Sequence, residues 1–314
     1  MIQFEEENSW NHFKWLSQFK KASKRRQGFR ELRVEVFRST VRLVKTGFYF
    51  VEGEKIFLDN QQSDFSDTVY YKSPNHVSNI EVEGTCGVSV INADCIETAR
   101  LIALSGYKPV VLNMANPENP GGGVLRGAGA QEENIFRRSN LFRSLYQFVG
   151  YGERVYGTYR HPEYSYPLQP ETGGIYSPNI TIFRGSEHNG YCLLREPYQL
   201  AFVTVAAMYS PELVIQNGVF RIADSFVEPT KQKIRTILRI AILNGHDSAV
   251  LSAFGCGAFC NPPNHVALLF QEVFKEDEFR NKLKLIVFAI IDDHNAWKSH
   301  NPNGNVLPFL KVFG

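Results

Sequence analysis

The chain from residue 87 onward alternates short apolar runs with longer amphipathic stretches. Apolar runs without polar alternation indicate strands that are buried on both faces. They lie at Val88–Ile91, Val110–Leu112, Ala201–Met208, Ala249–Leu251 and Leu285–Ile291. Because helical stretches separate these runs, the pattern predicts an α/β fold, with a largely parallel sheet sandwiched by helices.

Capping residues and prolines predict where the intervening helices begin. We expect helix starts near Asp94, near Gln131, at Pro229-Thr230 and at Asn261-Pro262-Pro263. The Gln131 helix is predicted to continue as one helix through Leu145, and the Pro229 helix to end at Asn244-Gly245. Ser177–Phe183 is predicted to be extended, and residues 151–175 to form a long surface excursion.

Residues 1–80 are expected to form a helical and hairpin extension packed on a core domain of residues 81–314. The residues Trp10, Phe13, Leu16 and Phe19 recur at helical spacing. A second helix is predicted from about Glu31 to Leu43, because Gly47 suits a helix end. Residues 48–58 have the pattern of a β-hairpin.

Composition describes an ordinary globular protein. The chain has 314 residues, of which 43% are hydrophobic and 21% charged, and its net charge is +2. That weak charge excludes a general nucleic-acid binder, so any anion recognition must be local. A basic cluster at Lys20, Lys21, Lys24, Arg25 and Arg26 is interpreted as a solvated helix connection, in preference to a contact with an acidic polymer.

Targeting and redox features favour an intracellular, cytoplasmic protein. The acidic start of the chain lacks the features of a signal peptide, and no apolar run is long enough to span a bilayer. The five cysteines have irregular spacing, which is typical of reduced thiols. Cys256 and Cys260 have no companion pair at metal-ligand spacing, so no metal site is expected. No organic cofactor is expected either.

Three consecutive glycines are the strongest functional signal. Asn119-Pro120-Gly121-Gly122-Gly123 follows the buried run at residues 110–112, and seven residues separate it from Gln131-Glu132-Glu133. Glycine lets the backbone approach an anion closely, and a helix start offers N–H groups without partners. The order strand, glycine loop, helix therefore predicts a phosphate-binding loop beside two carboxylates.

A second glycine-rich loop, Gly255-Cys256-Gly257-Ala258-Phe259, follows the run at residues 249–251. The carboxyl ends of parallel strands meet at one edge of a sheet, so we expect both loops and Asp94 at that edge. The two loops predict that backbone N–H groups hold a diphosphate from both sides.

Glu132 and Glu133 are the candidate catalytic acids. Neighbours on a helix point about 100° apart, so the pair does not match the facing carboxylates of most glycosidases. A single acid that protonates the leaving oxygen beside the substrate's own diphosphate is the arrangement we expect. The competing interpretation is the ordinary preference of acidic residues for helix N-termini.

The GGG-x7-QEE pattern resembles the signature of the bacterial-type poly(ADP-ribose) glycohydrolases, a branch of the macrodomain superfamily. Further similar segments occur in the family's order. They include Asn113, residues 175–178, 183–184, 196–198 and 255–259, and Phe288–Asp292. The resemblance implies a macrodomain-like mixed sheet and hydrolysis of ribose–ribose O-glycosidic bonds, which releases ADP-ribose from chain ends.

The same resemblance implies a role for each site residue. Gly121–Gly123 would bind the diphosphate, Glu133 would be the catalytic acid and Glu132 would orient ribose hydroxyls. Phe259 would press the distal ribose into its reactive pose, and Asp94 would receive the adenine amino group. The remaining expected ligand-binding residues are Asn113, Asn116, Gln131, Gly255, Cys256, Gly257 and Ala258, although the family more often has a small residue at the position of Asn116.

The expected partners are poly(ADP-ribose) or ADP-ribosylated macromolecules, with ADP-ribose as the product. We expect no membrane contact, no sequence-specific nucleic-acid binding and a monomer. Two alternatives stay open. One is a non-catalytic ADP-ribose reader, which the intact Gln131-Glu132-Glu133 disfavours. The other is a hydrolase of single ADP-ribosyl groups or of O-acetyl-ADP-ribose.

Overall fold

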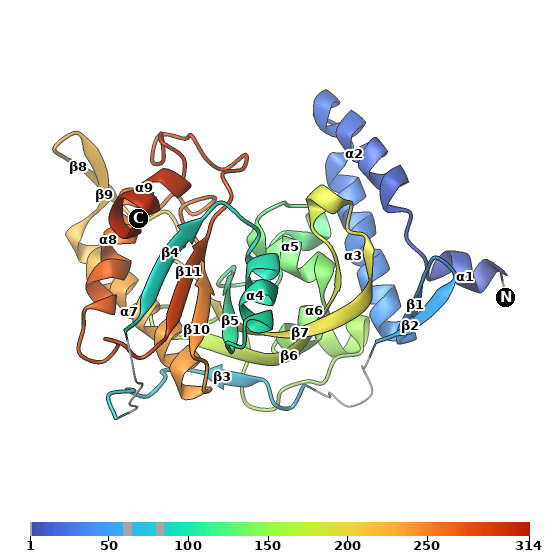
Figure 1. Ribbon diagram of the computed structural model, residues 1–314, viewed down its shortest axis with the longest axis horizontal. Helices are drawn as coiled ribbons and strands as arrows, with labels where there is room; N and C mark the ends of the chain where they lie inside the picture. Colours follow the sequence, from blue (N-terminus) through green and yellow to red (C-terminus); the bar gives the residue numbers. More distant parts are fainter. Residues whose placement is uncertain (1, 59–64, 80–84) are drawn as a thin grey trace. The chain divides into compact units, whose positions relative to one another are not determined.

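The computed structural model describes residues 2–58, 65–79 and 85–314 (Figure 1). The chain forms two compact units, each built from separate segments. Unit 1 comprises Met1–Val69, Glu118–Tyr166 and Ser177–Leu200, and unit 2 comprises Tyr70–Pro117, Pro167–Tyr176 and Ala201–Gly314. The division into an N-terminal extension of residues 1–80, packed on a core domain of residues 81–314, stays a prediction.

A seven-stranded sheet has the strand order β3-β6-β7-β5-β10-β11-β4. Parallel pairing joins β7 to β5, β5 to β10, β10 to β11, and β11 to β4, so the predicted largely parallel sheet is confirmed. Its strands are β3 (Val69–Tyr71), β4 (Gly87–Ile91), β5 (Pro109–Met114), β6 (Gly174–Arg184), β7 (Leu193–Val205), β10 (Ser248–Leu251) and β11 (Leu285–Ala289).

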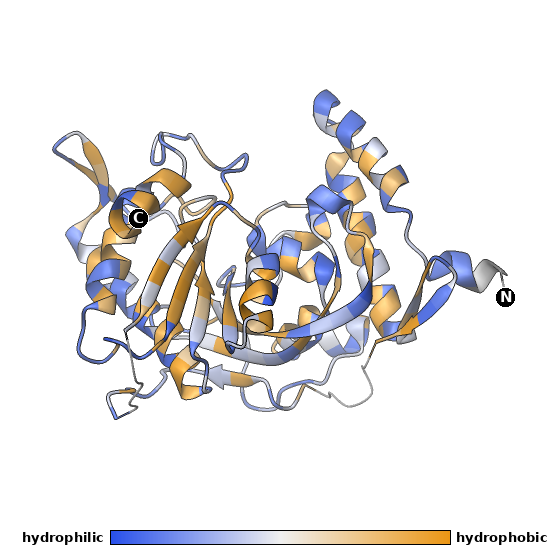
Figure 2. Cartoon of the chain, viewed as in Figure 1, coloured by the Kyte–Doolittle hydropathy of each residue, from blue (hydrophilic) through white to orange (hydrophobic). Residues whose placement is uncertain are grey.

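In unit 2 the central strands are apolar, as Figure 2 shows for β10 and β11. Helix α4 packs against β5 and β10, and α9 packs against β4. Side chains of α7, such as Ile237 and Leu238, lie in the same core as Val110 and Phe288. The helices are α4 (Cys95–Leu104), α7 (Asp224–Leu243), α8 (Pro263–Phe274) and α9 (Val306–Phe313).

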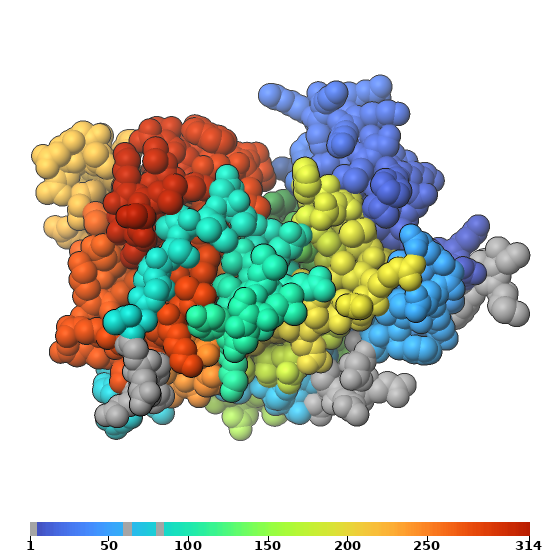
Figure 3. All heavy atoms as spheres, in the orientation of Figure 1, coloured from blue at the N-terminus to red at the C-terminus, as the bar shows by residue number. Residues whose placement is uncertain are grey.

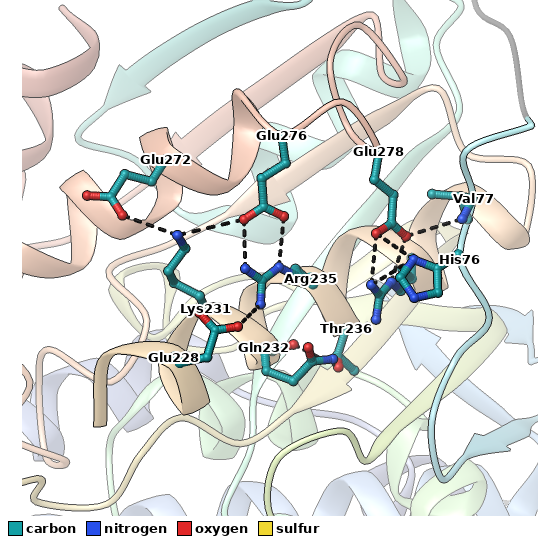
Figure 4. A network of polar contacts seen from close by, with 11 residues as sticks. His76, Val77, Glu228, Lys231, Gln232, Arg235, Thr236, Glu272, Glu276 and Glu278 are labelled. Carbon is teal, nitrogen blue, oxygen red and sulfur yellow. Dashed lines mark hydrogen bonds and ion pairs between the residues drawn. The ribbon is translucent and has the colours of Figure 1, made fainter. Parts of the chain in front are cut away.

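The polar face of α7 forms an ion-pair network (Figure 4). Arg235 donates two hydrogen bonds of 2.8 Å to Glu276, and Arg239 donates to both carboxylate oxygens of Glu278 at 2.7 and 2.8 Å. Burial raises the pKa of Glu278, but the hydrogen bonds from Arg239 and the Val77 amide outweigh burial and lower that pKa overall. The network joins α7 to the segment that follows α8.

Unit 1 combines an N-terminal helix pair with the helix that carries the candidate acids. Its main helices are α2 (His12–Arg25), α3 (Phe29–Thr46), α5 (Gln131–Arg138) and α6 (Leu141–Tyr146). The buried Thr40 hydroxyl on α3 donates to the Arg137 carbonyl on α5, and Phe37 packs against Phe136 and Phe142. Gly47 ends α3 in the left-handed conformation, as predicted, with φ 82°.

The predicted N-terminal hairpin is confirmed. Strand β1 (Phe48–Val51) pairs antiparallel with β2 (Glu54–Phe57). The remaining short elements are α1 (Ile2–Glu7), η1 (Val124–Arg126), η2 (Gly152–Tyr156), η3 (Glu187–Asn189), β8 (Leu213–Gln216) and β9 (Val219–Ile222). The β8–β9 hairpin and α9 were not predicted, although Asn217-Gly218 between two apolar runs is a local hairpin signal.

Two predicted boundaries are wrong. The helix expected from Gln131 through Leu145 is interrupted, because Ser139 is extended (φ −145°) and pairs with Ile182 in an isolated bridge. Helix α7 begins at Asp224 and contains Pro229 internally. Pro229 is the sixth residue of α7 and lacks an amide that would otherwise bond within the helix. The helix nevertheless begins before it, so this proline does not mark the first residue.

None of the helices in the described ranges has the length and apolar content that spanning a bilayer requires.

Candidate active site

The glycine loop requires glycine because α5 packs directly against it. Gly121 and Gly122 have φ of 79° and 51°, a region that other residues adopt only with strain. A Cβ on Gly121 would lie 2.5 Å from the Phe136 ring, and one on Gly122 would lie 2.6 Å from Glu133 Oε1. The three glycines therefore allow α5 to approach the loop closely.

Both candidate acids fold back onto this loop. The Gly121 amide donates to Glu132 Oε1 at 2.9 Å, and the Gly123 amide donates to Glu133 Oε1 at 2.8 Å. A Cβ on Gly122 would touch both carboxylates, at 3.1 Å from Glu132 and 2.6 Å from Glu133. Neighbouring helix positions point about 100° apart. The side chains of Glu132 and Glu133 are long and flexible, so both carboxylates still reach the same loop.

Glu133 has one oxygen held and one oxygen without a partner. Glu133 is 7% exposed, and its Oε2 is buried with no hydrogen-bond partner among the described residues. A buried polar atom without a partner costs about 1–3 kcal/mol. A catalytic role is one of the explanations for such an atom in a native protein. Glu133 Oε2 belongs to a carboxyl held against the glycine loop, which makes it a candidate ligand contact.

A buried polar chain holds α5 in place behind the acids. Arg137, one turn after Glu133, donates from Nε to the Tyr191 hydroxyl at 2.8 Å and from Nη1 to the Ala128 carbonyl at 2.9 Å. The Tyr191 hydroxyl donates to Glu187 at 3.0 Å, and Arg33 binds the same carboxylate with two hydrogen bonds of 2.7 Å.

This chain keeps Glu187 ionised. Burial raises the pKa of Glu187, but hydrogen bonds and charge from Arg33, the charge of Arg137 and the Tyr191 hydroxyl lower it overall. We call Arg33, Glu187, Tyr191 and Arg137 the anchor chain. It connects α3 to α5 and to the loop that leads from the glycines to α5, so we expect the orientation of Glu133 to depend on it.

In unit 2 three predicted residues lie near the carboxyl ends of strands, Asn113 within β5 and the other two after a strand. Asp94 caps α4, because its Oδ1 accepts from the amides of Ile96 and Glu97 at 3.1 and 3.0 Å. Asn113 on β5 is fully buried, with Nδ2 donating to Thr204 and Oδ1 without a partner in the described structure. Asn116 follows β5 and is partly exposed.

The second glycine loop is tied down by an asparagine that sequence reasoning missed. The Asn261 side-chain amide donates to the carbonyls of Met208, Gly255 and Phe259 at 2.7–3.1 Å. Gly255 has φ 74°, and a Cβ there would lie 2.6 Å from the Asn261 amide nitrogen. The sequence around Asn261 predicts only a helix start. No local pattern indicates that its side chain bonds to three backbone carbonyls.

The side chains of this loop differ in what they contact. Cys256 is fully buried and burial raises the pKa of its thiol well above the ordinary value, so the thiol is not a nucleophile. Its carbonyl accepts from His300 and Asn301 at 2.9 and 3.2 Å. Phe259 is half-buried and meets the exposed Tyr209 edge to face, with ring centroids 5.1 Å apart.

The predicted site residues thus fall into two groups, one in each unit. The glycine loop with Gln131, Glu132 and Glu133 belongs to unit 1, and Asp94, Asn113, Asn116 and residues 255–259 belong to unit 2. A diphosphate held by both loops stays a prediction. Within the described ranges, no three His, Cys, Asp or Glu side chains cluster as metal ligands would.

The fold defines a class of protein. The chain matches poly(ADP-ribose) glycohydrolase from Thermomonospora curvata with a TM-score of 0.68 and 27% identity, covering 90% of this chain and 99% of that chain. The same enzyme bound to the inhibitor ADP-HPD matches with a TM-score of 0.67 and 28% identity over the same shares. The fold is therefore the macrodomain-like α/β fold of bacterial poly(ADP-ribose) glycohydrolases.

Part of the sequence also matches a family model. Residues 38–185 match the model of the microbial-type PARG catalytic domain, PARG being poly(ADP-ribose) glycohydrolase. The enzyme from Deinococcus radiodurans in complex with ADP-ribose matches in fold, with a TM-score of 0.61, 24% identity and coverage of 82% of this chain and 98% of that one. No curated protein matches the chain. The predicted resemblance to bacterial-type poly(ADP-ribose) glycohydrolases is confirmed.

Proposed function

We propose that this protein hydrolyses ribose–ribose O-glycosidic bonds in poly(ADP-ribose) and releases ADP-ribose, with Glu133 as the general acid. The observation that carries the proposal is the geometry of the Glu133 carboxyl. One oxygen is fixed by the Gly123 amide, and the other is buried without a partner. A general acid needs a fixed carboxyl with one oxygen available to the substrate.

The proposed reaction uses one carboxyl group. Glu133 donates a proton to the leaving ribose oxygen while the bond from the anomeric carbon to that oxygen breaks. Negative phosphate oxygens of the substrate stabilise the oxocarbenium-like carbon. Water then adds to that carbon and returns a proton to Glu133, so the acid is regenerated. Cleavage at chain ends is carried over from the resemblance.

The other site residues take supporting roles in this proposal. Glu132, held by the Gly121 amide, orients ribose hydroxyls, and the glycine loop contacts the diphosphate. The unpartnered Asn113 Oδ1 provides an acceptor for the ligand. Asp94 receives the adenine amino group, and Phe259 presses on the distal ribose. Support for the ligand class comes from the Thermomonospora curvata enzyme, whose structure contains the inhibitor ADP-HPD.

Glu133→Gln is the decisive variant, because Gln keeps an oxygen that accepts from Gly123 and removes the acidic proton. We expect the rate of ADP-ribose release to fall about 10²–10⁴-fold, while the Kd for ADP-ribose changes little. Glu132→Gln is the matched control and should lose less turnover. Turnover is measured by chromatography of products from poly(ADP-ribose), and binding by calorimetry. Near-normal turnover in Glu133→Gln contradicts the assignment.

A non-catalytic reader is the main competing function. A reader does not require a buried carboxyl oxygen without a partner, which favours the enzyme. Binding of ADP-ribose with no release of product by the wild-type protein would establish the reader instead. Parallel incubation with mono-ADP-ribosylated protein and O-acetyl-ADP-ribose separates the remaining hydrolase activities.

A further inference from the structure

Unpaired positive charge gathers on one segment of unit 1. Residues 12–30 contain seven of the chain's 34 Lys and Arg and none of its 32 Asp and Glu, so the rest of the chain carries five more acidic than basic residues. All seven side chains are exposed, and none forms an ion pair with another described residue. They are Lys14, Lys20, Lys21, Lys24, Arg25, Arg26 and Arg30.

An exposed aromatic ring lies in line with these cations. Phe13 shares helical spacing with Trp10, Leu16 and Phe19, yet it is 75% exposed, whereas Trp15 is buried. Phe13, Ser17, Lys20 and Lys24 follow the spacing i, i+4, i+7 and i+11, which places them along one face of the helix. We call these four residues the α2 stripe. It extends about 16 Å along α2.

The segment also touches the loop that leads to the candidate acids. A Cβ on Gly127 would lie 2.1 Å from the Arg30 carbonyl oxygen, and one on Gly129 would lie 2.2 Å from Arg33 Nη1. The start of α3 is thus in direct backbone contact with the residues between the glycine loop and α5. Just before α2, the Trp10 ring donates from Nε1 to the Gly190 carbonyl at 2.8 Å, which holds the N-terminal end of the segment. In Figure 3 α2 projects at the molecular surface, and Figure 2 shows its C-terminal end as hydrophilic.

We propose that the α2 stripe and the adjacent cations bind the uncleaved remainder of the polymer substrate, a flexible chain of nucleoside diphosphates. Phe13 stacks on an adenine, and Lys20, Lys24 and their neighbours bind diphosphate oxygens. Alternation of base stacking and phosphate contacts is how proteins bind flexible nucleotide chains. A duplex nucleic acid fits less well, because its bases are already stacked and are not available to Phe13. The inference rests on the proposed hydrolase function.

The test compares long and short substrates. The variants are Lys20→Gln/Lys21→Gln/Lys24→Gln and, separately, Phe13→Leu, which keeps apolar volume and removes the ring. For the triple variant we expect KM for long poly(ADP-ribose) to rise roughly tenfold at low salt, with kcat nearly unchanged. The slope of log KM against log salt should weaken by about 2 units, since each single-strand phosphate contact contributes about 0.7. Phe13→Leu should raise KM without changing the salt slope.

Hydrolysis of the ADP-ribose dimer should be unchanged in every variant, because a dimer leaves no long remainder to bind. The matched control is Arg154→Gln/Arg160→Gln/Lys311→Gln, which removes three exposed cations elsewhere and should leave KM for long polymer unchanged. An equal change in the control, or no change in the stripe variants, overturns the inference. Loss of duplex DNA binding with unchanged KM for polymer would assign the surface to nucleic acid and also overturn it. Absence of dimer hydrolysis by the wild-type protein contradicts the proposed function itself.

Discussion

At the scale of single residues, Gly122 determines where the two acids lie. Its missing side chain leaves room for both carboxylates, and its φ of 51° turns the loop toward α5. The sequence suggested that the three glycines exist for a diphosphate. The structure shows that they are also required by Phe136, Glu132 and Glu133, which pack where side chains would otherwise be.

Gly122→Ala tests this steric role. The new Cβ would collide with Glu133 Oε1, so we expect ADP-ribose release to fall at least about tenfold, beyond any loss of stability. Backbone strain from positive φ costs about 1 kcal/mol by itself. Gly218→Ala is the control, because Gly218 has φ 76° with nothing within 4 Å. Thermal unfolding should show similar destabilisation in the two variants, and product chromatography should show a loss only in Gly122→Ala. Full activity of Gly122→Ala would contradict the role.

At the scale of secondary structure elements, α5 is a short helix whose position depends on the anchor chain. Thr40 and Tyr191 bond to Arg137 on α5, and Arg33 lies against Gly129 in the loop before it. Glu187 joins Arg33 to Tyr191. Their distance in sequence explains why residue patterns did not predict them. The predicted helix was correct in type and start, but tertiary pairing of Ser139 ended it early.

Tyr191→Phe removes the hydroxyl that joins Arg137 to Glu187. We expect a loss of about 1–3 kcal/mol in the free energy of unfolding, and a fall in kcat with little change in ADP-ribose affinity, because Glu133 loses its orientation. The matched control is Tyr49→Phe. It removes another buried hydroxyl bond, from Tyr49 to the Leu194 carbonyl at 2.6 Å, which is not connected to α5. Urea unfolding and steady-state kinetics measure both quantities, and an equal fall in kcat for both variants would show that the anchor chain has no specific role.

At the scale of the whole molecule, stability should depend on acid pH. His265 on α8 accepts from the Ile222 amide at 2.9 Å. Burial, followed by the charge of Arg221, lowers the pKa of His265 to about 4. Between pH 6.5 and 4 the unfolded chain therefore binds a proton that the folded chain does not. Stability falls as pH falls through this window, by up to about 3 kcal/mol.

His265→Gln should flatten the stability profile between pH 6.5 and 4, because Gln offers an acceptor to Ile222 and does not titrate. The exposed His188→Gln serves as the control and should keep the wild-type profile. Below pH 4.5 a further loss is expected from Glu278, whose lowered pKa means that its stabilisation is present at higher pH and disappears on protonation. Urea midpoints at half-unit pH intervals measure these changes, and identical profiles for His265→Gln and wild type would contradict the prediction.

The sequence by itself determined the α/β class, the parallel strands, the N-terminal helices and hairpin, and the two glycine loops with the acids of α5. These features depend on local patterns: apolar runs, helix-ending glycines and residue order along a few turns of chain. Only the tertiary structure decided that Phe13 is exposed, that Asn261 ties three carbonyls and that Glu133 keeps a buried oxygen without a partner. Burial and hydrogen-bond partners depend on segments far apart in sequence, so no local pattern contains them.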